Sequence, residues 1–201
     1  DFCHEPERLL EHAREGEEVG REHGLQIMSE VLAEISKGIA KLRMRDEGSA
    51  AHLKEAADRL ARSGQRIWGP YVRALQGEAL AQAGDVVAGL RITEEVLADI
   101  EARDERVHLA EVLRIRGWML LLQGEAANGV AALEEAIAFA QEQESRSWEL
   151  RATTTLARHL TATGRREEAL ARLAPIYGWF TEGFSTHDLL EAKALLDELA
   201  G

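Results

Sequence analysis

The amino-acid sequence predicts an all-α protein built as a solenoid of stacked helix pairs. Gly84, Gly124 and Gly164 recur at intervals of 40 residues. The apolar residues within each interval have helical spacing. The composition is 45% hydrophobic but only 5% aromatic, with 3 prolines, which argues against a β-sandwich and against disorder. A fixed period of about 20 to 50 residues is typical of repeat proteins, whose units bury their apolar faces against one another.

Each 40-residue interval contains two amphipathic segments, and we expect each segment to be a helix. Gly124 lies between the two segments of its interval, where a glycine permits the positive φ that ends a helix and reverses the chain. The apolar residues of these two segments are Leu109, Val112, Leu113, Leu120 and Leu121, followed by Val130, Leu133, Ala136, Ile137 and Ala140.

Two further glycines lie inside the predicted helices, where glycine costs about 1 kcal/mol relative to alanine. Gly117 and Gly129 have counterparts at Gly77 and Gly89, one period earlier. Because glycine has no Cβ, we expect the two helices of each hairpin to approach closely at these positions.

The predicted helices follow in chain order. The N-terminal region, residues 1–64, is less regular, since residues 38 and 49 are separated by eleven positions where the later repeats have twelve. Three repeats occupy 65–104, 105–144 and 145–184, and a capping helix occupies 185–201. The expected helices cover about 6–23, 25–46, 49–63, 68–83, 85–102, 107–122, 125–143, 147–163, 165–177 and 188–199.

Charge and composition exclude several functions. The chain has 24 Lys and Arg against 36 Asp and Glu, and its net charge of -12 repels nucleic acid and anionic membranes. A single cysteine, Cys3, and the lack of a long apolar run favour the cytoplasm. The chain begins at Asp1, so we expect it to be part of a longer protein.

No catalytic, cofactor or metal motif is present in the sequence. It contains no GxxxxGK[ST], GxGxxG or GxSxG pattern, and its seven histidines include no HxxxH pair. We therefore expect a non-enzymatic protein with no cofactor and no metal site.

The helix pairs resemble tetratricopeptide repeats, with Gly117, Gly129 and Ala136 at the small-residue positions. The 40-residue period and three segments are similar to the C-terminal repeats of bacterial multidomain signalling ATPases, including those linked to adenylate or guanylate cyclase domains and those acting as transcriptional regulators. The segments are residues 110–117 (AEVLRIRG), 147–151 (SWELR) and 177–184 (YGWFTEGF).

This resemblance implies a right-handed α-α superhelix of about four helix pairs with a C-terminal cap. It also implies a non-catalytic regulatory scaffold that binds a peptide or protein partner, or its own upstream domains, on the concave face. The family's binding positions fall on Tyr71, Glu78, Gln82, Glu111, Arg114, Trp118, Leu122, Arg151, Thr154, Arg158 and Thr161.

Alternatives to this binding surface remain open. Arg114, Arg151 and Arg158 are able to hold a peptide carboxylate, or they form ordinary intramolecular salt bridges. A different hypothesis is a small-molecule sensor that controls an attached ATPase or cyclase, with its pocket lined by Tyr71 and Trp118.

Two apolar clusters predict further contacts. Leu32, Ile35, Ile39 and Leu42 lie where the other repeats carry polar residues, which suggests a homodimer through the N-terminal helices. We expect the aromatic cluster of Trp179, Phe180 and Phe184 to seal the last repeat against the capping helix, although exposure there would mark an interface instead.

Overall fold

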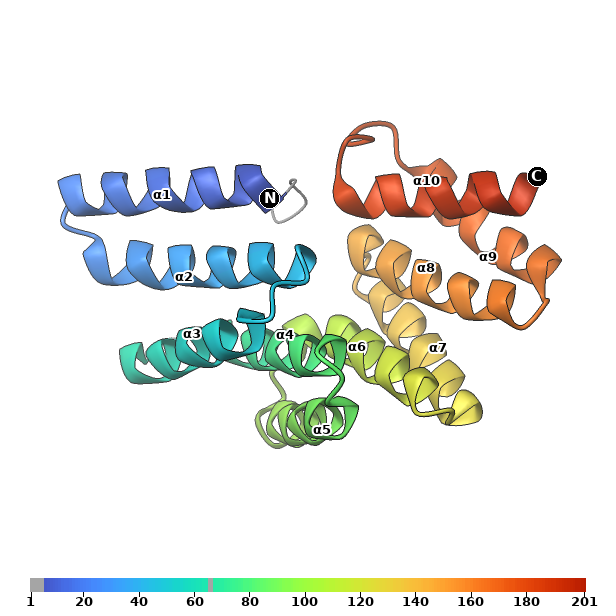
Figure 1. Ribbon diagram of the computed structural model, residues 1–201, viewed down its shortest axis with the longest axis horizontal. Coiled ribbons are helices and arrows are strands. Elements are labelled where there is room, and N and C mark those ends of the chain that lie inside the picture. Colours follow the sequence, from blue (N-terminus) through green and yellow to red (C-terminus); the bar gives the residue numbers. More distant parts are fainter. Residues whose placement is uncertain (1–5, 65–66) are drawn as a thin grey trace. The chain divides into compact units, whose positions relative to one another are not determined.

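A computed structural model of the protein describes residues 6–64 and 67–201, without the side chains of 26–28. This part of the chain is all-helical (Figure 1). The ten α-helices that it contains begin and end within three residues of the predicted positions, so the all-α prediction is confirmed. They are α1 (Pro6–Glu22), α2 (Gln26–Arg43), α3 (Ser49–Ser63), α4 (Gly69–Gln82), α5 (Val86–Arg103), α6 (Leu109–Leu122), α7 (Ala126–Glu142), α8 (Arg146–Ala162), α9 (Arg166–Trp179) and α10 (His187–Ala200), with a short 3-10 helix, η1, at Arg106–His108.

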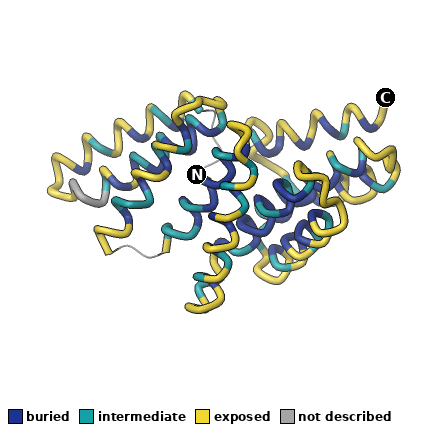
Figure 2. Tube along the Cα trace, turned by 60° about the horizontal axis from the view of Figure 1, so that its bottom comes forward, coloured by how far each residue is buried: buried dark blue, intermediate teal, exposed yellow. Residues whose placement is uncertain are grey.

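The chain divides into two compact units, Asp1–His108 and Leu109–Gly201. In the first unit, α1 to α4 each pack against the next helix along the chain. In the second unit, consecutive helices also pack together, and α8 additionally contacts α6 and α10. Buried and exposed residues alternate along several of the helices (Figure 2), whereas α6 is buried continuously from Ala110 to Ile115. The superhelix and the division of the chain into an N-terminal region, three repeats and a capping helix stay predictions.

Positive φ angles mark the turns between helices at a regular spacing. The predicted turn glycines Gly84, Gly124 and Gly164 have φ of 99°, 83° and 80°. The turns between one pair and the next follow the same period at Gly24, Gly64, Asp104 and Glu144, all with positive φ. The sequence pattern predicted breaks between helices at these positions but not the positive φ of the last two, because an aspartate and a glutamate replace glycine there.

The glycines inside the helices allow the close approach that the sequence predicts. A Cβ added to Gly117 would lie 2.9 Å from the carbonyl oxygen of Gly129 and 2.8 Å from Leu133 Cγ. A Cβ added to Gly77 would lie 2.9 Å from the carbonyl oxygen of Gly89. In both α4–α5 and α6–α7, a methyl group at these positions would therefore meet the backbone of the partner helix.

The predicted dimer face is mostly covered within the first unit. Ile35, Ile39 and Leu42 are buried, and Leu32 is 39% exposed. The reason is that α2 packs against both α1 and α3, which leaves little of this apolar stripe for a second copy. Dimerisation itself stays a prediction.

The expected aromatic seal at the end of the second unit is wrong as stated. Trp179 is 57% exposed and Phe184 is 46% exposed. The capping helix α10 instead buries Leu189, Ala192, Leu195 and Leu199, and it packs against α8 and α9. Because these aliphatic side chains close the unit, the aromatic rings stay at its surface.

Within the described residues, no helix combines the length and the apolar character needed to cross a membrane.

Candidate functional site

The predicted binding residues of the first unit lie on α4, and they have very different environments. Tyr71 is buried, and its ring stacks on His108 with centroids 5.1 Å apart and an interplanar angle of 19°. Trp68 lies 5.3 Å from the same imidazole. Burial lowers the pKa of His108 below its ordinary value of 6.5. Tyr71 therefore packs in the interior, as part of an aromatic cluster formed by Trp68, Tyr71 and His108.

The other two predicted binding residues of α4, Glu78 and Gln82, lie two and three turns after Tyr71. Glu78 is buried and Gln82 is exposed. Of the three α4 residues, only Gln82 therefore presents its side chain openly to solvent.

In the second unit, α6 and α8 bring three of the predicted residues into one ion cluster. The Glu111 carboxylate is fully buried. It accepts hydrogen bonds from Arg114 Nε and Nη2, both at 2.9 Å, and Arg151 Nη2 lies 2.6 Å from its Oε1 atom. We call Glu111, Arg114 and Arg151 the Glu111 cluster. Because Arg151 comes from α8, the cluster ties the two helices together.

The structure therefore supports the salt-bridge alternative for Arg114 and Arg151 as far as their contact with Glu111 is concerned. A guanidinium group has five N–H donors in a fixed fork, so an Arg that binds one carboxylate is able to contact a second acceptor. Arg114 is buried, whereas Arg151 is partly exposed. Of the two, Arg151 is the one that a partner is able to reach.

Further predicted residues extend this surface along both helices. Trp118 is half-buried and Leu122 is 52% exposed, and with Arg114 they follow one side of α6 at spacings of four residues. On α8, Trp148 lies 5.4 Å below the Arg151 guanidinium, and Arg158 is exposed two turns further on. We define the α6/α8 face as Glu111, Arg114, Trp118, Leu122, Trp148, Arg151 and Arg158.

Three other predicted binding residues, Arg158, Thr154 and Thr161, also make contacts within the protein. Arg158 lies 3.3 Å from Glu191 of α10, so it forms a surface ion pair. Thr154 and Thr161 each donate a hydrogen bond at 2.7 Å to the backbone carbonyl four residues earlier. These hydroxyl groups satisfy their own helix, and they offer a partner less than the arginines do.

A second polar network in this unit was missed by the sequence prediction. Glu149 is buried, accepts hydrogen bonds from Gln141 at 2.8 Å and Arg146 at 2.6 Å, and thereby joins α7 to α8. Arg146 also lies 5.5 Å from the centroid of the exposed Trp179 ring. The i, i+3 spacing of Arg146 and Glu149 was a usable signal, whereas the long-range contact with Trp179 has no counterpart in the local sequence.

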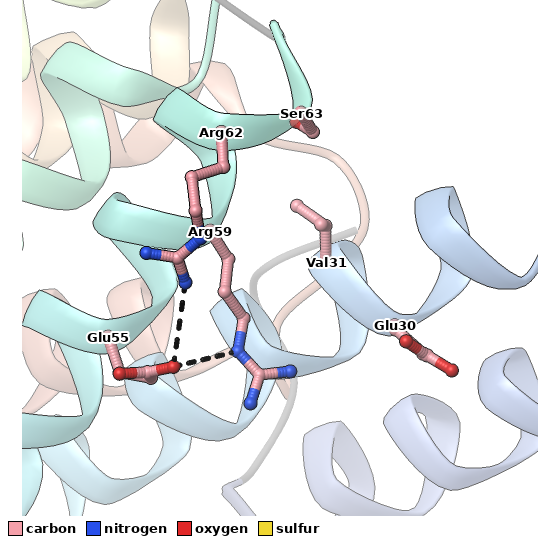
Figure 3. Close-up of a pocket in the computed structure, with 6 residues that line it drawn as sticks. All are labelled: Glu30, Val31, Glu55, Arg59, Arg62 and Ser63. Atoms are coloured by element: carbon pink, nitrogen blue, oxygen red, sulfur yellow. Dashed lines mark hydrogen bonds and ion pairs between the residues drawn. The ribbon is translucent and has the colours of Figure 1, made fainter.

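Three open clefts lie elsewhere on the units. One of about 450 Å³ lies between α2 and α3, where Arg59 and Arg62 both point toward Glu55 (Figure 3). Arg59 Nε donates to Glu55 at 3.1 Å, and Arg62 Nη2 lies 3.7 Å from the same carboxylate. The other two, of about 330 and 620 Å³, are lined by α3, α4 and α5 and by α9 with Leu199. None of the three contains Tyr71, Trp118 or another predicted binding residue.

A scan against known protein families and a search of curated proteins found no match for the chain.

Proposed function

We propose that the protein is a non-catalytic interaction domain that binds a peptide or protein segment on the α6/α8 face. The observation that carries the proposal is the Glu111 cluster, in which a buried carboxylate on α6 holds an arginine from α8. This contact fixes the two helices beside each other, so that their side chains form one continuous surface.

The residues on this surface are of the types that contribute most to protein recognition. Tryptophan and arginine are enriched among the residues whose truncation weakens interfaces most. Trp118 and Trp148 are half-buried, so their rings are held by packing while part of each stays accessible. Rigid aromatic groups on helices lose little conformational entropy when a partner binds.

The wider role rests on the resemblance to tetratricopeptide repeats, supported by the 40-residue period of the turns. On this proposal the helix pairs form a concave superhelix in the cytoplasm. The chain then belongs to a larger bacterial signalling protein, and partner binding on α6 and α8 is transmitted to upstream domains.

The proposal is tested with a displayed library of random peptides selected on the whole chain. Enriched peptides are titrated by calorimetry against the wild-type protein, Trp118→Ala and Leu122→Ala. Truncating an interface anchor costs more than about 1 kcal/mol, so we expect affinity to fall roughly tenfold or more in Trp118→Ala, with a smaller loss in Leu122→Ala.

Val87→Ala is the matched control, because Val87 is an exposed aliphatic residue on α5. Equal binding by all four proteins, or no enrichment of any peptide, contradicts the proposal. The sensor alternative makes the opposite prediction: metabolites stabilise the protein against heat, and no peptide binds.

A further inference from the structure

We infer that the segment bound by the α6/α8 face is acidic, with carboxylates spaced about three residues apart in an extended chain. This inference rests on the proposed function and adds the chemistry of the partner. It follows from the distribution of charge among the helices of the second unit.

The two helices that form the face carry arginines but expose no carboxylate. Helix α6 contains Arg114 and Arg116 with a single acid, and α8 contains three arginines with a single acid. Both acids, Glu111 and Glu149, are buried and already accept hydrogen bonds from arginine. The formal charge that these helices present at their surface is therefore positive.

The neighbouring helices have the opposite composition. Helix α7 contains Glu134, Glu135 and Glu142 and no lysine or arginine. Helix α10 contains four acids and only Lys193. In a chain of net charge -12, the α6/α8 face is thus cationic, whereas α7 and α10, which pack against these helices, are acidic. Such a face favours an anionic partner and disfavours a cationic one.

The spacing of the accessible arginines sets the spacing of the partner's charges. Arg151 and Arg158 are seven residues apart on one side of α8, which corresponds to about 10 Å along a helix. A peptide in the extended polyproline II conformation advances about 3.1 Å per residue with three residues per turn, so its carboxylates at positions i and i+3 lie on one side and about 9 Å apart, close to this separation. Trp118 and Leu122 of α6 are then available to an apolar side chain of the same peptide.

Glu191 competes for the same surface. Its carboxylate lies 3.3 Å from Arg158, and both side chains are about half exposed. A partner's carboxylate that binds Arg158 has to replace this contact. Removing the Glu191 charge should therefore strengthen binding, which a merely structural role of Arg158 does not predict.

The probes are two labelled peptide libraries, one with a fixed Asp-x-x-Asp pattern and one with Asn-x-x-Asn. Fluorescence anisotropy with the whole chain is measured at low and at high salt. We expect the Asp library to bind roughly tenfold more tightly, with an advantage that shrinks as salt screens the exposed charges. Arg151→Gln and Arg158→Gln should each remove most of the difference in affinity between the Asp and Asn libraries, and Glu191→Gln should increase that difference.

Arg91→Gln is the control, because Arg91 is an exposed arginine in an i, i+4 pair on α5. Since Arg158 and Glu191 are at the surface, their variants test the inference even if Arg151→Gln is unstable. Equal binding of the two libraries overturns the acidic-partner inference and leaves the proposed function standing. If Trp118→Ala, Arg151→Gln and Arg158→Gln all bind the peptides with the affinity of the wild-type protein, the inference and the proposed function are both overturned.

Discussion

At the residue scale, the second unit depends on the buried carboxylate of Glu111. This one group accepts hydrogen bonds from Arg114 and binds Arg151 across two helices. Removing one partner of a buried ion pair costs more than forming the pair ever gained, because the remaining charge loses its compensation. Glu111 therefore holds in place the arginines that the proposed function needs.

We predict that Glu111→Gln lowers the free energy of unfolding by roughly 3 kcal/mol, because two guanidinium groups lose their common carboxylate. Urea denaturation followed by circular dichroism measures the change. Glu135→Gln is the control, since Glu135 lies exposed on α7 and should change stability by less than about 0.5 kcal/mol. Similar values for the two variants would show that the cluster contributes little.

His108 predicts a pH dependence of stability in the first unit. Burial lowers its pKa below 6.5 in the folded protein, whereas the unfolded chain keeps the ordinary value. The unfolded state therefore binds the proton more readily, and stability that is present above pH 6.5 is lost as pH falls toward the folded pKa.

We expect the free energy of unfolding to decrease from pH 7.5 to 5.5 more in wild type than in His108→Phe, with an extra slope of at most about 1.4 kcal/mol per pH unit. All other titratable groups are common to both proteins, so the difference isolates His108. If the free energy of unfolding has the same pH dependence in wild type and His108→Phe, burial of His108 does not cause the loss of stability at low pH.

At the element scale, the described turns between helices contain three residues other than glycine with positive φ, namely Arg45, Asp104 and Glu144. Asp104 and Glu144 have φ of 54°, where Gly64 occupies the equivalent turn with φ of 76°. A side chain in this left-handed region costs about 1 to 2 kcal/mol. The turns at Asp104 and Glu144 therefore keep the 40-residue spacing of the other turns despite local backbone strain.

Glu144→Gly should raise the free energy of unfolding by up to about 1 kcal/mol, because it relieves that strain at the end of α7. Glu135→Gly, in the interior of the same helix, should instead lower it by about 1 kcal/mol. Thermal denaturation of both variants provides the comparison. A destabilised Glu144→Gly would mean that its side chain matters more than its backbone.

The close contact within the α6–α7 hairpin gives a second prediction at this scale. In Gly117→Ala, the new methyl group meets Gly129 and Leu133, and overpacking of this kind costs about 1 to 3 kcal/mol. The higher helix propensity of alanine offsets about 1 kcal/mol of that cost. We expect a net loss of about 1 kcal/mol by urea denaturation.

Gly16→Ala is the control for this substitution. Gly16 lies inside α1, and an added Cβ there has no neighbour within 4 Å among the described atoms. The same change should therefore stabilise the protein by about 1 kcal/mol. Equal effects at Gly16 and Gly117 would argue against the close approach of α6 and α7.

At the scale of the whole molecule, the helices and turns were predictable because they repeat. Glycines such as Gly124 mark a fixed period, and helical spacing defines what lies between them. At Asp104 and Glu144 the breaks between helices were predicted but the positive φ angles were not, because neither residue type indicates such a φ. Repetition thus predicted the elements better than any single residue did.

The details of the candidate site were less predictable, because they depend on contacts between distant residues. Glu111, Arg114 and Arg151 lie on two helices that contact each other, but the family positions did not reveal that one carboxylate binds both arginines. They also placed Tyr71 on a binding surface, whereas packing against His108 buries it. Helical periodicity predicts which side of a helix a residue lies on, but it does not predict which residues of other helices it contacts.

The most direct test of the central claim is site-specific photo-crosslinking of a bound peptide. A photoreactive amino acid replaces Leu122 on the α6/α8 face or, as the comparison, the exposed Val87 on α5. Peptides selected on the wild-type chain are the probe, and mass spectrometry identifies the products. The account predicts crosslinks from position 122 and none from position 87. Crosslinks from position 87 alone would place the binding surface outside α6 and α8 and would contradict it.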